Sequence, residues 1–393
     1  MNQNIEFIRG NAPCYVYDSK VIIQNCSRLA ENLPMVDFLY SIKTNPFDPV
    51  IQIVTKQGFG ADASSVNEVF KADAAGITAD KIFYSTPGKT SDDIEATYGR
   101  CVHIADSFHE LELLDKAADA HDEVLRVGVR INPCAGFNES EGSSKFGIDE
   151  EFLFSSEMQL AAFEHLTISG VHMHLKSQVL SAEQLGLYYE RCYDLAVRTN
   201  ELKNTDIRFV NFGSGIGMVY DADTQSDVDL DRLAETLKKI RDRNTVSLGA
   251  VLYIETGRFV VGNAGKYYTI VTDIKESRGT KYLIVKNGLN GFSRPAIAQL
   301  LKNAWGHYPE SGMEPLYTCS NEVTVRVINE EHEKEIVTIV GDLCTAQDVI
   351  CSNVAANKAS IGDLIEITNA GSYGFTLSMT QFASHNEPAQ LIL

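Results

Sequence analysis

The sequence lacks a long apolar run and an excess of basic residues. No stretch approaches about 18 uninterrupted apolar residues, and the first ten residues carry Asn, Gln, Glu and Arg where a secretory signal needs a hydrophobic block. The 34 Lys and Arg residues face 53 Asp and Glu residues, which gives a formal net charge of −19. Such a field repels nucleic acid and anionic membranes. We therefore expect a cytoplasmic protein with neither of these as a partner.

Paired cysteines are also missing, although the chain contains eight cysteines. None forms a CxxC pair or has the spacing of a zinc site, so we expect most of them to be buried thiols. The composition itself is that of a globular protein, with 44% hydrophobic and 22% charged residues, which excludes a disordered or fibrous chain. A length of 393 residues suggests about two domains of roughly 150 residues or more.

Apolar runs alternate with helix-like stretches over the first two thirds of the chain. The helix-like stretches have apolar residues at three- and four-residue spacing; they include Ser65–Ala75, Ser107–Ala118, Ser181–Thr199 and Asp229–Arg243. The runs that separate such stretches are Phe38–Lys43, Gly58–Ser64, Lys81–Thr86, Val102–Ser107, Leu125–Asn132, Ile168–Leu175, Ile207–Gly213 and Val251–Gly257. Eight strands joined by helical crossovers predict a (β/α)8 TIM barrel, an α/β fold.

A second domain with a different character follows Gly257. Its apolar runs read as strands with no comparable helices between them, namely Tyr267–Lys275, Lys281–Lys286, Glu322–Ile328, Glu335–Val340 and Leu364–Thr368. We expect a C-terminal β-sandwich or barrel domain at residues 266–393. The barrel then spans residues 26–265, and the N-terminal segment 1–25 pairs with the β domain through the strand-like run Ala12–Tyr17.

Polar residues gather where the predicted barrel strands end, which is where barrels carry their chemistry. The first strand ends at Lys43, which is either a surface lysine or an amine held in a partly desolvated pocket for Schiff-base chemistry. His172 and His174 are two residues apart on one strand and share a face. They could be a metal pair, an aromatic platform for a planar cofactor, or packed histidines. The remaining histidines form no ligand set with them, so we expect no metal.

The last two strand ends add groups that could bind a cofactor. Asn211–Gly217 is a turn of small residues that lets backbone N–H groups approach an anion. Glu255 and Arg258 follow on the next strand, either as an ion pair that closes the barrel or as a carboxylate and a guanidinium for a ligand. An amine, a flat aromatic shelf, a phosphate cradle and an acidic group together suit pyridoxal 5′-phosphate.

The chain resembles the fold-type III pyridoxal-phosphate decarboxylases, which include the diaminopimelate and ornithine/arginine decarboxylases and have a barrel like that of alanine racemase. The resemblance covers nearly the whole chain. Its motifs are Ala12–Asp18, Tyr40–Asn45, Gly60–Ser64, Ser144–Gly147, His172–Gln178, Asn211–Gly217, Glu255–Arg258, Arg294–Ala296, Gly341–Asp348 and Ala370–Gly374.

This resemblance implies roles for individual residues. Lys43 would be the Schiff-base lysine, His174 would stack on the cofactor ring, and Glu255 would face the pyridine nitrogen, with Asp62 nearby. The phosphate would be bound by Ser177, Gly213, Ser214, Gly215, Gly257, Arg258 and Tyr373. Cys344 would be the catalytic cysteine that reaches into the partner subunit's active site and protonates Cα. The minimal active unit would then be a head-to-tail homodimer.

Departures from the family bear on the substrate. Thr345 stands where diaminopimelate decarboxylases carry the Glu that binds the distal amine, whereas Arg294 remains and could grip a distal carboxylate. Further substrate contacts would come from Arg258, Asp348 and Tyr373. We expect decarboxylation of an α-amino acid other than meso-diaminopimelate, either a carboxylate-bearing conjugate of the siderophore type or a polyamine precursor.

Three alternatives remain open at this point. An amino-acid racemase of the same fold would place an Arg against the pyridine nitrogen, so Glu255 favours decarboxylation. A non-catalytic pyridoxal-phosphate-binding protein usually lacks the β domain, and the motifs around Cys344 and Tyr373 argue against it. A metal-dependent barrel hydrolase is the third, and a metal assay distinguishes it.

Overall fold

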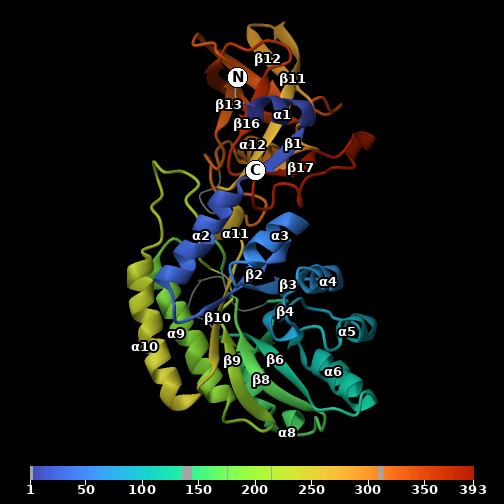
Figure 1. The fold of residues 1–393 in the computed structure, drawn as a ribbon, viewed down its shortest axis with the longest axis vertical. Coiled ribbons are helices and arrows are strands. Elements are labelled where there is room, and N and C mark those ends of the chain that lie inside the picture. The colour runs from blue at the N-terminus through green and yellow to red at the C-terminus, as the bar shows by residue number, and fades with distance from the viewer. Residues whose placement is uncertain (1–2, 135–143, 175, 214, 309–312) are drawn as a thin grey trace. The chain divides into compact units, whose positions relative to one another are not determined.

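The computed structural model describes residues 3–134, 144–174, 176–213, 215–308 and 313–393 (Figure 1). The chain folds into two compact units. The first, which we call the β unit, comprises Met1–Ile22, Met218–Ser226 and Arg258–Leu393. The second, the barrel unit, comprises Ile23–Gly217 and Asp227–Gly257. The predicted domain limits at residues 25 and 265 stay a prediction.

Parallel strands form the centre of the barrel unit. In the described residues their order is β5-β4-β3-β2-β10-β9-β8-β6, and pairing between β5 and β6 closes the ring, with the short β7 (Ile148–Asp149) beside β6. This closed barrel confirms the predicted fold class. The strands of the ring are β2 (Asp37–Ser41), β3 (Gly60–Ala63), β4 (Ile82–Tyr84), β5 (Val102–Ala105), β6 (Leu125–Asn132), β8 (Leu166–His172), β9 (Thr205–Asn211) and β10 (Val251–Thr256).

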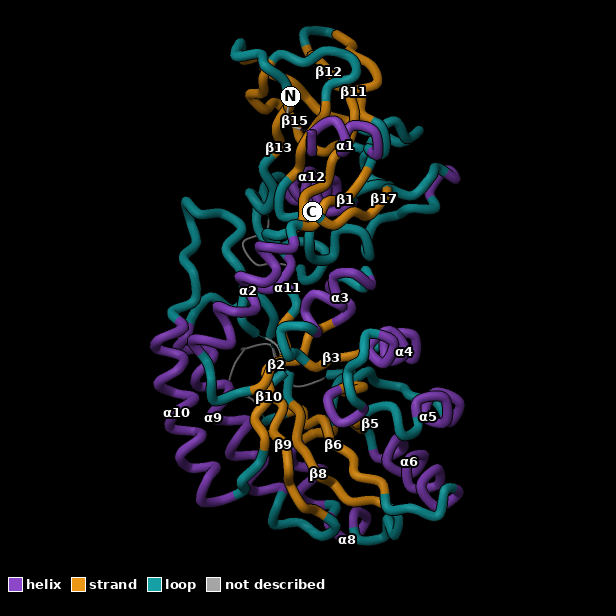
Figure 2. The backbone as a smooth tube through the Cα atoms, in the orientation of Figure 1, coloured by secondary structure: helices purple, strands orange, loops and turns teal. Residues whose placement is uncertain are grey.

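Helices surround these strands, as Figure 2 shows. Capping side chains explain where several of them begin: Ser65, Ser107 and Ser181 each accept a hydrogen bond from the backbone three residues ahead, and Asp229 does the same. The helices are α2 (Ser19–Asn32), within which the boundary between the units falls, α3 (Asp48–Thr55), α4 (Val66–Ala74), α5 (Ser91–Thr97), α6 (Phe108–Ala120), α7 (Glu150–Ser155), α8 (Glu157–Leu160), α9 (Ala182–Thr199) and α10 (Leu230–Ser247), with the 3₁₀ turns η1 (Ile42–Thr44) and η2 (Ala79–Lys81).

The interior of the barrel is filled by large side chains packed against small ones. Leu39, Phe83, Ile104, Phe209 and Tyr253 form a buried cluster contributed by five strands. A Cβ at Gly170 would lie 2.0 Å from the Phe209 ring, so the ring occupies the space that a side chain there would need. The strands are therefore held by a packed core, and the polar groups are left at the strand ends.

The β unit has a largely antiparallel sheet. Its order is β13-β16-β11-β12-β14-β15, with β1 paired to both β11 and β17. The strands are β1 (Cys14–Tyr17), β11 (Gly265–Ser277), β12 (Thr280–Val285), β13 (Val325–Ile328), β14 (Lys334–Val340), β15 (Val349–Asn357), β16 (Leu364–Ile367) and β17 (Ala389–Ile392); the helices are α1 (Gln3–Asn11), α11 (Arg258–Val261), α12 (Ser293–Trp305) and the turn η3 (Phe382–Ser384).

The expectation that the β unit has no comparable helix was wrong. Helix α12 spans 13 residues and carries the Arg294-Pro295 pair in its first turn, where proline is tolerated because that N–H has no helical partner. Ala, Leu, Gln and Lys dominate the rest of the helix. Gly306 then ends it in the left-handed conformation, with φ 77°. No helix of the described residues is long and apolar enough to cross a membrane.

Candidate active site

Three consecutive strand ends bring Lys43, Asp62 and Ser85 together. Lys43 lies in the turn η1 after β2, and its Nζ donates to Asp62 Oδ2 at 2.7 Å. Asp62, in β3, is fully buried, and its Oδ1 accepts a hydrogen bond of 2.6 Å from the hydroxyl of Ser85, which follows β4. The Lys43 side chain keeps 40% of its surface exposed. The barrel thus holds an accessible amine on a buried carboxylate.

Two members of this region were missed from the sequence. Ser85 directly follows strand β4, and a polar residue at a strand end is the feature that indicated Lys43 and Glu255. Glu68, in α4, accepts a hydrogen bond from the Ser64 N–H at 2.7 Å. Burial raises the pKa of the Glu68 carboxyl to about 7, even though that N–H and Lys43 oppose the shift.

Glu255 is the centre of the second polar group of the barrel unit. It lies in β10 with its carboxylate buried. Its Oε1 accepts a hydrogen bond of 2.9 Å from Asn211 Nδ2 and lies 3.2 Å from His172 Nε2, and its Oε2 lies 3.9 Å from His174 Nδ1. Burial alone would raise the pKa of Glu255, but His172, Lys43 and His174 hold that pKa well below its usual range. The carboxylate is therefore ionised at neutral pH.

The register of three neighbouring strands creates this arrangement. Asn211 of β9 is aligned with His172 of β8 on one side and with Tyr253 of β10 on the other. His174 follows two residues after the end of β8. Burial lowers the pKa of its imidazole to about 3, although Glu255 opposes the shift. At neutral pH His174 is a neutral, flat ring, which suits stacking rather than ion pairing.

Two glycines of the turn after β9 lie close to other parts of the chain. Gly213 has φ +66°, and a Cβ there would lie 2.3 Å from the carbonyl oxygen of Met173. A Cβ at Gly215 would lie 2.7 Å from Leu185, so neither position has space for a side chain. Ser214, the third residue predicted in this turn, lies outside the described residues.

The other predicted phosphate contacts of the barrel unit lie on the segments after β8 and β10. Ser177 Oγ lies 3.4 Å from His174 Nε2, within hydrogen-bonding distance. A Cβ at Gly257 would lie 2.1 Å from Thr44 Oγ1, so the backbone comes close to the turn that carries Lys43. An amine, a neutral ring, an ionised carboxylate and a turn of close-packed glycines fit a phosphorylated pyridine aldehyde such as pyridoxal 5′-phosphate.

Arg258 and Tyr373 belong to the β unit. The Arg258 guanidinium is buried, donates to Tyr220 Oη at 2.6 Å and pairs with Glu314. Its central carbon lies 5.2 Å from the centroid of the Tyr373 ring, a cation–π distance. The structure therefore brings these two predicted residues together and adds Glu314, an anion that the sequence did not reveal.

The charged groups of two predicted substrate contacts are engaged inside the β unit. Arg294 is 1% exposed, and its Nη2 donates to Glu322 Oε2 at 2.7 Å. Asp348 is buried and accepts backbone hydrogen bonds from Leu289 at 2.6 Å and from Leu343 at 2.9 Å. Both residues thus support loops of this unit.

The remaining predicted residues lie on the loop between β14 and β15. Cys344 is exposed and is unpaired as a thiol, and Thr345 is half-buried. The carbonyl of Thr345 accepts the backbone N–H of Asp348 at 3.3 Å, and its hydroxyl accepts that of Gln347 at the same distance. The buried Asp348 therefore anchors a short loop that presents the Cys344 thiol at the surface of this chain.

Comparisons with known proteins show the family of the chain. The family model of the pyridoxal binding domain of pyridoxal-dependent decarboxylases matches residues 19–262. The chain is 26% identical to the L-glutamyl-[BtrI acyl-carrier protein] decarboxylase of Niallia circulans, over 98% of this chain and 89% of that protein. It is also 26% identical to the 2-[(L-alanin-3-ylcarbamoyl)methyl]-2-hydroxybutanedioate decarboxylase of Staphylococcus aureus, over 96% of this chain and 93% of that protein.

A solved structure of a decarboxylase is similar to this chain over nearly its whole length. The diaminopimelate decarboxylase of M. jannaschii in co-complex with L-lysine is 25% identical, with a TM-score of 0.83 over 99% of this chain and 89% of that one. The family match spans more than half of the sequence, including every barrel strand. The chain belongs to the pyridoxal-dependent decarboxylases, enzymes that use pyridoxal 5′-phosphate to remove a carboxyl group as carbon–carbon lyases.

Proposed function

We propose that the protein decarboxylates an α-amino acid whose far end differs from that of meso-diaminopimelate. The observation that carries this proposal is Thr345 directly after Cys344, where diaminopimelate decarboxylases have a glutamate for the distal amine. Two of its relatives are named for substrates of other kinds, a glutamyl group on a carrier protein and a carboxylate-rich conjugate of an alanine unit. The candidates are a carboxylate-bearing conjugate and a polyamine precursor.

The geometry of the barrel unit supports several of the proposed cofactor contacts. When bound, pyridoxal 5′-phosphate supplies an electron sink for the pair left by the departing carboxylate. Lys43 would hold it through its amine, and Asp62 orients that amine. Ser177 and the glycines at 215 and 257 would hold the phosphate, while Gly213, whose N–H donates to Asn211 Oδ1, would shape the turn. Ser214, Arg258 and Tyr373 are assigned by the family resemblance.

Two further side chains have roles that depend on their charge. The ionised Glu255 would accept a hydrogen bond from the protonated ring nitrogen and so favour the protonated ring. The neutral His174 offers a flat face without a competing positive charge. This pairing is the reverse of a racemase, in which an arginine would discourage protonation of the ring nitrogen, and it favours decarboxylation.

Cys344 is proposed as the proton donor. After carbon dioxide leaves, Cα carries the electron pair of the broken bond; the Cys344 thiol gives its proton to that carbon, and the thiolate takes a proton back from water. We propose that this thiol serves the partner subunit's active site, in a head-to-tail homodimer. The exposed position of Cys344 on a single chain supports that arrangement.

A panel of amino acids tests the substrate class. Release of carbon dioxide by the reconstituted enzyme would be measured for meso-diaminopimelate, lysine, ornithine, arginine and α-amino acids joined at the far end to a polycarboxylate, with Lys43→Ala as the blank. We expect one of the others to exceed meso-diaminopimelate in kcat/KM. Turnover of meso-diaminopimelate at least as fast as the best alternative would overturn the proposal.

Mixing two inactive variants tests the shared site. Lys43→Ala and Cys344→Ala would each be inactive or slow alone, whereas a mixed dimer has one intact site, so re-assembly should restore about a quarter of the wild-type activity. Cys134→Ala, which removes another exposed thiol, is the matched control and should behave as wild type. A mixture with no recovery would show that both residues act within one chain.

A further inference from the structure

We propose that Asn211 is a positioning residue that ties the glycine turn after β9 to the carboxylate of Glu255. The inference rests on the roles proposed above for that turn and that carboxylate, and it does not depend on which amino acid is decarboxylated. All three groups belong to the barrel unit.

The side chain of Asn211 uses both ends of its amide. It is fully buried at the last position of β9. Its Nδ2 donates to Glu255 Oε1 at 2.9 Å, and its Oδ1 accepts the backbone N–H of Gly213 at 2.9 Å. A single planar group therefore fixes the distance and direction between the carboxylate and the start of the turn.

The chemistry of the two neighbours determines the orientation of the amide. The backbone N–H of Gly213 can only donate, so the atom that faces it must be the amide oxygen. The Glu255 carboxylate, which its neighbours hold ionised, can only accept, so the atom that faces it must be the amide nitrogen. A flipped amide would lose both hydrogen bonds at a fully buried position, which costs more than the bonds themselves contribute.

The turn also depends on this contact for its shape. Because Asn211 takes the Gly213 N–H, the first donor of the turn is satisfied internally. Gly213 keeps φ +66° with its Cα hydrogen packed against the Met173 carbonyl, and its own carbonyl accepts the Glu255 N–H at 2.9 Å. The conformation of Gly213 is therefore fixed before an anion arrives, and a phosphate site needs such preorganisation.

Different substitutions should separate the two ends of the amide. Asn211→Ala removes both contacts. Asn211→Asp keeps an acceptor for Gly213 but places a second carboxylate against Glu255, which favours protonation of one of the pair. The matched control is Asn244→Ala: Asn244 is also buried and bonds through both ends of its amide, to the backbone of Ala250 at 2.7 and 3.1 Å, in the loop before β10.

The test measures the full chain stripped of cofactor and then reloaded. Affinities for pyridoxal 5′-phosphate and for pyridoxal, which lacks the phosphate, would be obtained by fluorescence quenching, and the pH dependence of the bound cofactor's absorbance would be recorded. Asn211→Ala should weaken binding of pyridoxal 5′-phosphate by roughly tenfold and binding of pyridoxal by less. Asn211→Asp should keep the preference for the phosphorylated form but shift the pH profile. Asn244→Ala should lower the melting temperature but change neither the preference for pyridoxal 5′-phosphate over pyridoxal nor the pH profile.

The outcome that overturns the proposal is an Asn211→Ala protein that loses stability like Asn244→Ala yet keeps the wild-type preference and pH profile. If Asn211→Ala does not fold, Asn211→Asp decides alone, and an unchanged pH profile rejects the link to Glu255. Failure of the proposed substrate class would appear in the carbon dioxide panel and leave these binding measurements unaffected, so the two results are distinguishable.

Discussion

Two lysine–carboxylate pairs in the barrel unit have the same length and different surroundings. Lys43 Nζ lies 2.7 Å from Asp62 Oδ2, and Lys89 Nζ lies 2.7 Å from Glu110 Oε2. The Lys43 side chain is 40% exposed, whereas that of Lys89 is 0% exposed. The distance therefore does not distinguish the two amines, but their exposure does, and it supports the role proposed for Lys43.

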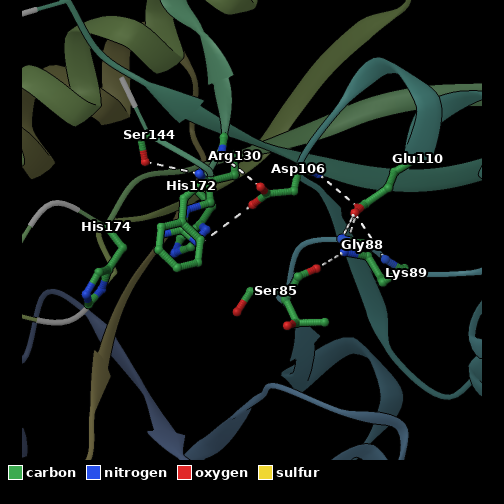
Figure 3. Close-up of polar contacts among 12 residues, drawn as sticks. Ser85, Gly88, Lys89, Asp106, Glu110, Arg130, Ser144, His172 and His174 are labelled. Atoms are coloured by element: carbon green, nitrogen blue, oxygen red, sulfur yellow. Dashed lines mark hydrogen bonds and ion pairs between the residues drawn. The ribbon is translucent and has the colours of Figure 1, made fainter. Parts of the chain in front are cut away.

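The second pair is enclosed by further contacts, as Figure 3 shows. Glu110 also accepts the backbone N–H groups of Gly88 at 2.6 Å, Lys89 at 3.2 Å and Asp106 at 3.0 Å, so it joins the loops after β4 and β5. Lys89 Nζ lies 5.3 Å from the centroid of the Tyr84 ring. This buried pair joins the loops at the barrel mouth, whereas the partly exposed amine of Lys43 is accessible to a ligand.

The largest expected effect separates the two amines directly. Lys43→Ala should lower turnover by roughly 10³-fold or more, because it removes the amine proposed to hold the cofactor covalently. The cofactor should also no longer be fixed to the protein by borohydride reduction, as intact mass would show. Lys89→Met should retain that covalent trapping. Trapping lost in Lys89→Met but kept in Lys43→Ala would reverse the comparison.

The enclosed pair should matter most for stability. Lys89→Ala leaves Glu110 as a buried charge without its cation, and we expect the free energy of unfolding to fall by about 3–5 kcal/mol. The double variant Lys89→Met with Glu110→Gln should recover part of this loss, because neither remaining group is charged. Chemical denaturation monitored by circular dichroism measures both. A loss below about 1 kcal/mol for Lys89→Ala would contradict the structural role.

The stability of the folded protein should depend on pH through His103, which is buried near Lys89. Burial, with Lys89 adding to it, lowers the pKa of His103 to about 3, so below pH 6.5 the unfolded chain binds a proton that the folded chain does not. Stability from this residue is therefore complete above about pH 6.5 and is lost as the pH falls toward 3. At pH 5 the loss should be about 2 kcal/mol.

The variant His103→Gln should lack this part of the pH dependence. Denaturation midpoints of both proteins between pH 7 and pH 4.5 provide the measurement, and only the difference between them is assigned to His103. If the midpoints of the two proteins changed equally with pH, His103 would take up a proton in the folded protein as readily as in the unfolded chain.

The smallest expected effect concerns the open pair. Ser85→Ala removes the donor to Asp62 Oδ1, and we expect the free energy of unfolding to fall by about 1 kcal/mol, with slower fixation of the cofactor on Lys43. Ser85→Thr keeps the hydroxyl and is the matched control. Equal fixation rates in the wild type, Ser85→Ala and Ser85→Thr would show that Asp62 needs no second donor.

Much of the barrel could be predicted from the sequence, because parallel strands are buried on both faces and appear as continuous apolar runs. Leu125–Asn132 has the predicted limits, and the other runs differ from the observed strands by a few residues at their ends. Strand ends also indicated Lys43 and Glu255, since the chemistry of a barrel lies there. The less regular β unit was harder: β15 and β17 were not predicted.

Contacts between distant residues could not be predicted in the same way. Asn211 and Glu255 are 44 positions apart, and Ser85 and Asp62 are 23 apart, so their hydrogen bonds depend on strand register rather than on any local pattern. The partners of Arg258 and Arg294 were missed for the same reason. Glu314 and Glu322 lie in a segment whose sequence shows no motif, and only the fold brings them to the two arginines.

The pairing of β1 has a consequence for the order in which the two units can fold during synthesis. Strand β1 is hydrogen-bonded to β17, with Cys14 aligned to Ala389 and Tyr17 to Ile392. During synthesis β1 is made more than 370 residues before its neighbour β17. The barrel strands, which end at Thr256, are complete well before then. The ribosome therefore releases a chain whose catalytic barrel can fold early, while the sheet around β1 is finished only by the last strand.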